Sequence, residues 1–340
     1  MQKKRVLKRF FTIIGILAVL LTVSGLIFIK YLDGFSRKAA NKNAPEVTFE
    51  IERGETLYAV SQHLEKRDII SSSRLFSMYT LLKNQAKNLK AGEYLLSGAM
   101  PPELILDIIT SGKVKLYRLT VPEGLTLFET AGLFEKRGFG TREDFISAAE
   151  SEELAKSLGI QANTLEGYLF PDTYFFSKQT SAEDVIRKMV RRFQHVYTDK
   201  WKKRTREMGL TVHEIVTLAS IIEKETGQAS ERPVISSVFH NRLEKGMRIE
   251  SDPTVIYGIE DFDGNLTRKN LRTKTPYNTY MIKGLPPGPI ASPGEMALKA
   301  ALYPEDTDYL FFVSKKDSTH KFSKTIKEHN RAVRKYQLNR

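Results

Sequence analysis

The hydrophobic pattern is most pronounced near the N-terminus. Residues 10–29, FFTIIGILAVLLTVSGLIFI, contain no charged side chain. At about 1.5 Å rise per residue, a helix over this run is about 30 Å long, the thickness of the hydrocarbon core of a bilayer. Five of the nine residues before it are basic, and such residues stay on the cytoplasmic side. The pattern predicts a cytoplasmic tail over 1–9 and a single-pass anchor over 10–30, with the rest of the protein outside the cytoplasm at the cell membrane.

A cleaved signal peptide is the alternative interpretation of this run. We favour an uncleaved anchor, because the run is long for a signal peptide and no A-x-A-like cleavage site follows it directly. Residues 36–45 are polar and basic and end in Pro, which indicates a linker, and we expect this linker to extend over 31–45.

An internal repeat follows the linker. Residues 51–70 and 121–140 align at a constant offset of 70 and share the tripeptide EKR. Each copy predicts a strand, a Gly turn, a Thr N-cap (Thr56 or Thr126) and an amphipathic helix. The repeat predicts a duplicated β-α module rather than a solenoid. Chance similarity between two common turn-helix units is the alternative.

The first copy continues into a second helix over 73–82 and a strand over 91–96. The order Gly-Glu-Thr-Leu, helix, helix, strand resembles LysM-type modules, which bind glycan chains rich in N-acetylglucosamine. The resemblance implies a LysM-like module over 46–117. For the whole chain we expect an α+β fold, in which residues 118–340 form a mixed α/β domain.

A helix predicted over 212–226 carries the strongest candidate chemistry. Thr211 and Glu214 form a capping-box pattern at its start. At about 100° per residue, Glu223 and Glu225 lie on opposite flanks of the apolar face. Glu223 shares its flank with small and apolar residues, so we expect partial desolvation to raise its pKa and suit it to general acid catalysis. A boundary glutamate paired with a nearby Arg is the alternative.

Residues 275–294, TPYNTYMIKGLPPGPIASPG, cannot form an ordinary helix or strand. Five Pro and several Gly impose an extended and turned backbone. Long irregular segments in compact domains commonly form binding walls. Tyr277, Asn278 and Tyr280 offer flat apolar faces with amide and hydroxyl groups, which suit a sugar polymer. A purely structural loop is the alternative.

Composition excludes several functions. The net charge is +13, but residues 1–45 hold nine Lys or Arg and one Asp, which leaves +5 for the other 295 residues. Without an aromatic-plus-basic motif, this excess argues against nucleic-acid binding. The absence of Cys excludes disulfides, thiolate zinc sites and Cys nucleophiles. The six His show no H-x-x-x-H spacing, so no metal or cofactor is predicted.

Several long motifs together carry a family resemblance. They are ASIIEKETG, NRLEKGMRIESDPTVIYG, YNTYMIKGLPPGPIASPG, LEGYLFPDTY and the ending YLFFV…HKFSKT…EHN. LEGYLFPDTY comes first along the chain, and the other motifs follow in the order given. Together, from about residue 46 to the C-terminus, they resemble the endolytic murein transglycosylases of the YceG-like type. There are two small departures. Glu250 stands where Gln is common, and the segment before His320 lacks the usual glycines.

The resemblance implies an activity and a site. Such enzymes are peptidoglycan lytic transglycosylases that cleave the MurNAc-GlcNAc β-1,4 bond of nascent glycan strands, leave 1,6-anhydroMurNAc ends and terminate strand elongation. It implies that the first glutamate of the E-K-E motif, Glu223, is the catalytic acid. The residues expected to bind substrate are Glu225, Asp252, Tyr257, Asn278 and Tyr280. The expected partners are peptidoglycan strands, the cytoplasmic membrane, and peptidoglycan synthases with division or elongation proteins.

Two alternatives stay open at this point. One is a muramidase that uses water, with Asp252 or Glu225 as the second carboxylate. The other is a non-catalytic wall-binding anchor that recruits synthesis or division machinery. The ends of the cleaved glycan distinguish the two chemistries, and loss of all cleavage would favour the anchor.

Overall fold

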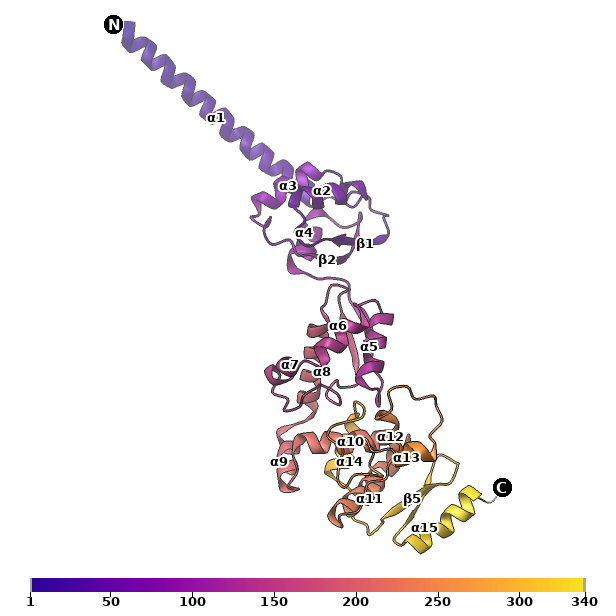
Figure 1. Cartoon of the computed structure of the whole chain (residues 1–340). Helices are drawn as coiled ribbons and strands as arrows, with labels where there is room; N and C mark the ends of the chain where they lie inside the picture. Colours follow the sequence, from indigo (N-terminus) through magenta and orange to yellow (C-terminus); the bar gives the residue numbers. More distant parts are fainter. Residues whose placement is uncertain (1, 339–340) are drawn as a thin grey trace. The chain divides into compact units, whose positions relative to one another are not determined.

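A computed structural model describes residues 2–338, which form a mostly helical α+β structure with small two-stranded sheets. The chain divides into two compact units. The N-terminal unit comprises the described residues up to Tyr117 with 177–179, and the C-terminal unit comprises 118–176 with the described residues from Thr180 onward. Figure 1 shows the elements of each unit in sequence colours.

The first element, α1, is a single helix over Gln2–Ser36. Its segment Phe10–Ser36 is long and apolar enough to cross a membrane. The helix continues beyond residue 30, where we expected a linker to begin, because its last turns pack on the N-terminal unit. Leu32 is only 1% exposed and Ser36 is fully buried. α1 contacts α3 and α4 of this unit.

The rest of the N-terminal unit has the order strand, helix, helix, strand, helix. Strands β1 and β2 are antiparallel, with Val47 opposite Leu96 and Phe49 opposite Tyr94. Inward-facing side chains of both strands form one core with Val60, Leu64 and Phe76 of the helices. The elements are β1 (Glu46–Ile51), α2 (Leu57–Lys66), α3 (Ser73–Leu82), β2 (Gly92–Ser97) and α4 (Pro102–Ser111).

The two copies of the sequence repeat have matching local structures. Helix α5 begins 70 positions after α2, and Thr56 and Thr126 both cap their helices through the side-chain oxygen. Gly54 and Gly124 both take a left-handed conformation, at φ 84° and 77°. The duplicated turn-helix prediction is therefore confirmed at the level of local structure.

The first part of the C-terminal unit packs helices around a short sheet of β3 and β4. Ser181 caps the start of α8, since the Asp184 amide donates to Ser181 Oγ at 3.1 Å. The elements are β3 (Tyr117–Thr120), α5 (Leu127–Lys136), α6 (Arg142–Ala149), α7 (Glu152–Ser157), β4 (Thr173–Phe176), α8 (Ala182–Val196) and α9 (Asp199–Glu207).

The remaining part of this unit is built around α10. Every residue from Ile215 to Ile222 is buried, so the helix is enclosed on all sides and packs closely against α14. The elements are α10 (Val212–Glu225), η1 (Ala229–Glu231), α11 (Arg232–Glu244), α12 (Asp252–Tyr257), α13 (Arg268–Arg272), α14 (Glu295–Leu302), β5 (Phe311–Ser314), β6 (His320–Ser323), α15 (Ile326–Val333) and η2 (Arg334–Leu338).

Two segments differ from what their local sequence indicates. The apolar run YLFFV over 309–313 is typical of a core strand, but β5 begins at Phe311 and only its Val313 is buried. This strand pairs with β6 in the part of the chain that the structure describes, and its Phe side chains line a cavity. The Ser-Asp-Pro-Thr sequence over 251–254 is typical of a loop, but Asp252 begins helix α12, because a Pro in the first helical turn needs no amide partner. Residues 275–294 run largely outside helices and strands, as predicted.

Candidate active site

The C-terminal turn of α10 carries both candidate glutamates. The capping box at its start is present, since the Thr211 amide donates to Glu214 Oε2 at 2.8 Å and the Glu214 amide donates to Thr211 Oγ1 at 3.2 Å. The helix ends at Glu225. Because Glu223 and Glu225 leave the helix on opposite flanks, they enter different surroundings.

Glu223 lies in a closed ion pair. Its Oε1 accepts a hydrogen bond from Arg232 Nη2 at 2.6 Å, and its Oε2 accepts one from the Gly294 amide at 3.0 Å. The Glu223 side chain is 6% exposed and that of Arg232 is 8% exposed. Glu123 approaches the same Arg232 nitrogen at 3.5 Å. Both oxygens of Glu223 are therefore occupied by groups that stabilise the carboxylate.

Gly294 is the N-cap of α14, so Glu223 places a negative charge at the start of that helix. This position suits a carboxylate, because the helix dipole is positive there. Burial raises the pKa of Glu223, while the Gly294 amide and the Arg232 guanidinium oppose that increase. The carboxylate of Glu223 therefore links α10 to α11 and to the start of α14.

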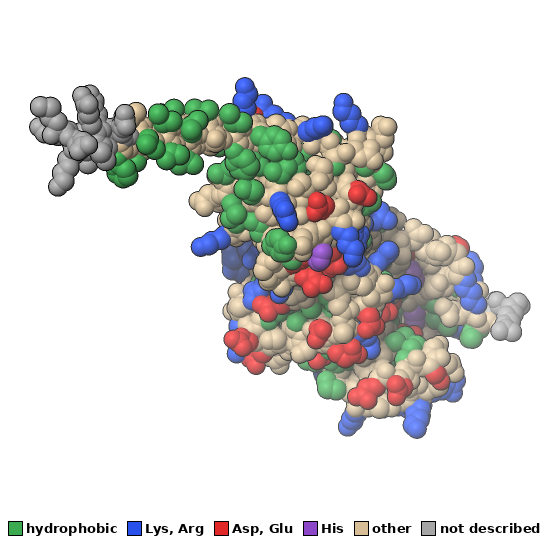
Figure 2. Space-filling model, turned by 90° about the horizontal axis from the view of Figure 1, so that it is seen from above, with side chains coloured by type: hydrophobic (Ala, Val, Ile, Leu, Met, Phe, Trp, Pro, Cys, Tyr) green, Lys and Arg blue, Asp and Glu red, His purple; other side chains and the backbone are tan. Residues whose placement is uncertain are grey.

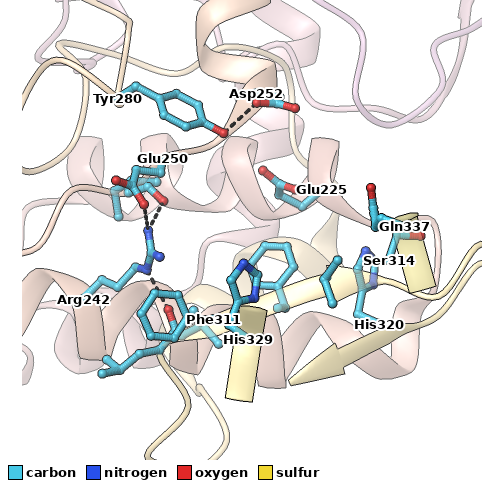
Figure 3. Close-up of a pocket in the computed structure, with 15 residues that line it drawn as sticks. Glu225, Arg242, Glu250, Asp252, Tyr280, Phe311, Ser314, His320, His329 and Gln337 are labelled. Carbon is cyan, nitrogen blue, oxygen red and sulfur yellow. Dashed lines mark hydrogen bonds and ion pairs between the residues drawn. The ribbon is translucent and has the colours of Figure 1, made fainter. Parts of the chain in front are cut away.

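Glu225 instead lines a cavity of about 410 Å³ in the C-terminal unit. Figure 3 shows its side chain between the Asp252–Tyr280 pair on one side and the rings of Phe311 and His329 on the other. The other lining residues are Val238, Arg242, Ile249, Glu250, Leu310, Phe312, Val313, Ser314, His320 and Gln337.

Burial raises the pKa of Glu225 from its ordinary 4.5 to about 7. The Ser251 hydroxyl, which donates to Glu225 Oε1, opposes this increase, and the negative charge of Asp252 adds to it. No ion pair with a basic side chain offsets the desolvation among the residues that the structure describes. A carboxyl of this kind carries a proton near neutral pH and can release it, as a general acid must.

A buried hydroxyl network holds the loop beside Glu225. The Ser251 amide donates to Thr279 Oγ1 at 3.0 Å, and Thr254 Oγ1 lies 2.8 Å from Thr279 Oγ1. Thr254 Oγ1 also donates to the Ser251 carbonyl at 2.6 Å. Through this network the Pro- and Gly-rich segment fixes the Ser251 hydroxyl against the carboxyl of Glu225.

Asp252 and Tyr280 form the opposite wall of the cavity. The Tyr280 hydroxyl donates to Asp252 Oδ1 at 2.7 Å. Burial, followed by this bond to Asp252, raises the pKa of Tyr280. The hydroxyl therefore keeps its proton at every physiological pH and holds the Asp252 carboxylate beside Glu225.

Glu250 and Arg242 form a second pair in the cavity. Arg242 Nη1 donates to Glu250 Oε2 at 2.9 Å and to the carbonyls of Arg248 and Ile249 at 2.9 and 3.0 Å. Glu250 has a left-handed backbone with φ 56°, a strained conformation for a residue other than Gly. Glu250, which stands where Gln is common in the motif, therefore lies at the cavity.

Two expected substrate-binding residues have their polar groups occupied elsewhere. Asn278 is 1% exposed, and its Nδ2 donates to backbone carbonyls, including that of Thr273 at 2.6 Å. Its Oδ1 accepts from the Tyr280 amide at 3.0 Å, so it organises the loop that carries Tyr280. The Tyr257 hydroxyl donates to Glu166 Oε2 at 3.2 Å, and its ring packs against Tyr277 with centroids 4.8 Å apart.

The six candidates from the sequence therefore divide into two sets. Glu225, Asp252 and Tyr280 come together at one cavity, whereas Glu223, Tyr257 and Asn278 make internal contacts. The cavity also contains polar and aromatic residues to which the sequence pattern assigned no role, among them Arg242, Phe311, His320 and His329. For His320 the available signal was its position in the C-terminal motif HKFSKT. The others come from α11, β5 and α15, whose convergence no local pattern reveals.

Glu166 is a further buried acid in this unit, and the sequence analysis also passed over it. It is 3% exposed, and burial raises its pKa to about 7. Its carboxyl accepts from the amides of Leu127 and Gly167. Among the described residues, no group of three or more His, Asp or Glu could hold a metal ion.

Comparisons with known proteins identify relatives over most of the chain. The model of the YceG-like family matches residues 49–335. A Bacillus subtilis protein named endolytic murein transglycosylase is 35% identical over 306 residues, covering 85% of this chain and 84% of the relative. A Streptococcus pneumoniae protein of the same name is 31% identical over 299 residues, covering 79% of this chain and 54% of the relative.

A solved structure supports the same relationship. The crystal structure of a yceG-like protein from Listeria monocytogenes matches with a TM-score of 0.59 and 36% identity. The match covers 84% of this chain and 98% of that chain. The family model, the curated relatives and the shared fold all extend over the candidate site, and the chain belongs to the YceG-like family.

Proposed function

We propose that this protein is a membrane-anchored endolytic lytic transglycosylase that cleaves the MurNAc-GlcNAc β-1,4 bond of nascent peptidoglycan strands. The observation that carries the proposal is the position of Glu225. It is a cavity-lining acid whose pKa burial raises to about 7, and it lies two positions after Glu223, the acid that the motif resemblance implies. Relatives named endolytic murein transglycosylase, aligned over most of the chain, supply the reaction class.

In this proposal Glu225 is both the acid and the base. The protonated carboxyl donates its proton to the glycosidic oxygen, and the bond from that oxygen to C1 of the muramic sugar breaks. The resulting carboxylate then accepts the proton of the C6 hydroxyl of the same sugar as its oxygen bonds to C1. A 1,6-anhydro end forms, and Glu225 regains its proton. Because the nucleophile belongs to the substrate, orientation in the cavity replaces a bound water.

The groups around Glu225 support these steps. The Ser251 hydroxyl donates to one oxygen of Glu225 and orients the carboxyl. The negative charge of Asp252 raises the pKa of Glu225 and suits the positive charge that develops on the sugar ring. Tyr280 holds Asp252 in place through its hydroxyl. Phe311 and Phe312 offer apolar surface to the sugar rings.

Glu223 is the competing candidate for the proton donor, as the motif resemblance suggested. Its two oxygens already accept from Arg232 and Gly294, whereas Glu225 has no basic partner among the described residues. Proton transfer from Glu223 would require this ion pair to open. We therefore assign Glu223 a positioning role, holding the end of α10 and with it Glu225.

The proposal extends to the N-terminal unit. Helix α1 contains a segment, Phe10–Ser36, that is apolar and long enough to span a bilayer. With the basic N-terminal residues in the cytoplasm, the C-terminal unit faces the cell wall. The β1-α2-α3-β2 arrangement is consistent with a LysM-like module that holds glycan strands near the membrane. Termination of strand elongation next to synthases and division proteins follows from this location.

Digestion of purified glycan strands tests the proposal. Wild type, Glu225→Gln and Glu223→Gln are compared, with Glu244→Gln at an exposed position of α11 as the matched control. We expect wild type and Glu244→Gln to release fragments with 1,6-anhydro ends, and Glu225→Gln to lose about 10²–10⁴-fold in rate. Full activity of Glu225→Gln would refute the assignment of the acid.

The carboxylate of Asp252, next to Glu225, is compatible with an alternative reaction, hydrolysis by a muramidase. In a muramidase, Asp252 would activate water or attack the sugar, and the product would carry a reducing end. Mass analysis of the new ends separates the two reactions, since the anhydro product is lighter by one water. Reducing ends made by wild type would replace the transglycosylase proposal with the muramidase.

A further inference from the structure

Helix α1 enters the N-terminal unit with no free linker. Leu32 is 1% exposed, Ser36 is fully buried, and Phe35 packs against the core of the unit. Leu32 follows Ile29, the last residue of the apolar run, by about 4.5 Å along the helix axis. The headgroup layer of a bilayer is about 5–8 Å thick on each side. When α1 crosses a membrane, the face of the unit around α1 therefore lies at headgroup depth.

That face carries exposed apolar side chains on α3, one of the helices that α1 contacts. Met78, Leu81 and Leu82 are 42%, 60% and 60% exposed, and we call these three residues the α3 patch. They lie at helical spacing on the side away from the buried Phe76 and Tyr79. An amphipathic helix that faces water would carry polar residues at these positions.

The segment that carries the α3 patch is basic. The segment 73–90 contains Arg74, Lys83, Lys87 and Lys90 and no acidic residue. Figure 2 shows hydrophobic side chains gathered near the base of α1, with Lys and Arg side chains around them. Apolar residues with a basic border are typical of helices that lie in the interface of an anionic bilayer.

We propose that the α3 patch inserts into the headgroup region of the same bilayer that α1 crosses. The inference rests on the proposed membrane anchoring by α1. Two features favour lipid over a protein partner. The patch is on a helix that directly contacts α1, and the segment 73–90 that carries it has four basic residues and no acidic one. The contact would hold the N-terminal unit flat on the membrane, as a second attachment beside the anchor.

Depth-dependent fluorescence quenching tests this contact in the full-length protein. The chain has no Cys, so single cysteines can be introduced and labelled with an environment-sensitive fluorophore such as NBD. The variants are Leu82→Cys in the patch, Val19→Cys within α1 as the positive control, and Glu50→Cys on β1, away from α1 in Figure 1, as the negative control. Each is reconstituted in nanodiscs that contain anionic phospholipid, without quencher or with lipids that carry spin labels both near the headgroup and deep in the acyl chain.

We expect the label at residue 82 to lose at least half as much fluorescence as the label at residue 19, and several-fold more than the label at residue 50. Quenching at 19 with a residue 82 signal like that at 50 would overturn the proposal and leave the anchor intact. Absence of quenching at 19 would overturn the anchor and the inference with it. Shielding of residue 82 without lipid quenching, and only in discs with two copies, would assign the patch to a second chain and overturn the proposal.

Discussion

The two glutamates of the E-K-E motif should respond in opposite ways to the same change. Glu225→Gln replaces a desolvated carboxyl by a neutral group of almost the same shape, and the Ser251 hydroxyl keeps an acceptor. Glu223→Gln keeps an acceptor for the Gly294 amide but removes the negative charge that faces Arg232. We expect Glu225→Gln to lower the cleavage rate about 10²–10⁴-fold and to stabilise the fold, and Glu223→Gln to destabilise the fold.

The magnitude for Glu225 follows from its pKa, which burial raises from 4.5 to about 7. A raised pKa in the folded state means that the protonated form contributes stability below pH 4.5, and that this contribution is lost as the pH rises through 7. At about 1.4 kcal/mol per pH unit, ionising Glu225 costs about 3 kcal/mol of unfolding free energy above pH 7. Gln has no such cost. The variant should gain about 3 kcal/mol over wild type at pH 8 and almost nothing at pH 4.

The magnitude for Glu223 follows from its ion pair. Breaking a buried ion pair costs about 3–5 kcal/mol, because the remaining charge stays buried. Glu123 at 3.5 Å from Arg232 offsets part of that loss, so we expect about 2–3 kcal/mol. For a unit of this size the melting temperature should fall by about 4–12 °C.

Thermal melts at pH 4, 6 and 8, paired with cleavage rates, measure both effects, and Glu244→Gln is the control that should change neither. The reasoning fails if Glu223→Gln loses activity at an unchanged melting temperature while Glu225→Gln remains active. That result would return the catalytic role to the first glutamate, as the motif resemblance suggested. Equal melting curves for Glu225→Gln and wild type at pH 8 would contradict the desolvation of Glu225.

Three further substitutions test the surrounding structure. Tyr280→Phe removes the hydrogen bond from the Tyr280 hydroxyl to Asp252. We expect the initial cleavage rate to fall roughly tenfold with little change in melting temperature. An unchanged rate would exclude the Asp252–Tyr280 pair from the reaction. Asn278→Ala leaves several buried backbone groups without partners, so the unfolding free energy in urea should fall by about 3 kcal/mol. Gly167 has φ 83°, and a Cβ at this position would lie 2.4 Å from Pro289. Gly167→Ala should therefore lower the unfolding free energy in urea by at least about 3 kcal/mol. A loss below about 1 kcal/mol would contradict this close approach.

Features that depend on neighbouring residues could be predicted from the sequence. The capping boxes, the Thr N-caps of the two repeat copies and the turn-forming glycines each require only a few adjacent side chains. The apolar run at 10–29 predicted the long helix α1 by length alone. The Pro- and Gly-rich composition of 275–294 excluded regular structure in the same way. Local backbone preferences and hydrophobic periodicity are sufficient for such elements.

The surroundings of each side chain could not be predicted in this way. The sequence suggested that Asn278 binds a sugar, but its side-chain amide donates to backbone carbonyls of its own loop. These contacts depend on the folded conformation of the loop, which the sequence pattern does not give. The end of α1 looked like the start of a linker, because nothing nearby in the sequence indicates that α3 and α4 bury Leu32.

The sequence by itself determined that two glutamates, two positions apart, stand on opposite flanks of one apolar helix. Only the tertiary structure decided what each flank faces. Arg232 and Gly294 enclose Glu223, whereas Ser251 and the cavity receive Glu225. These partners come from other elements, up to 71 positions away in the chain. Desolvation and charge pairing arise from such long-range packing, and they decide which of two similar carboxyls holds a proton at neutral pH.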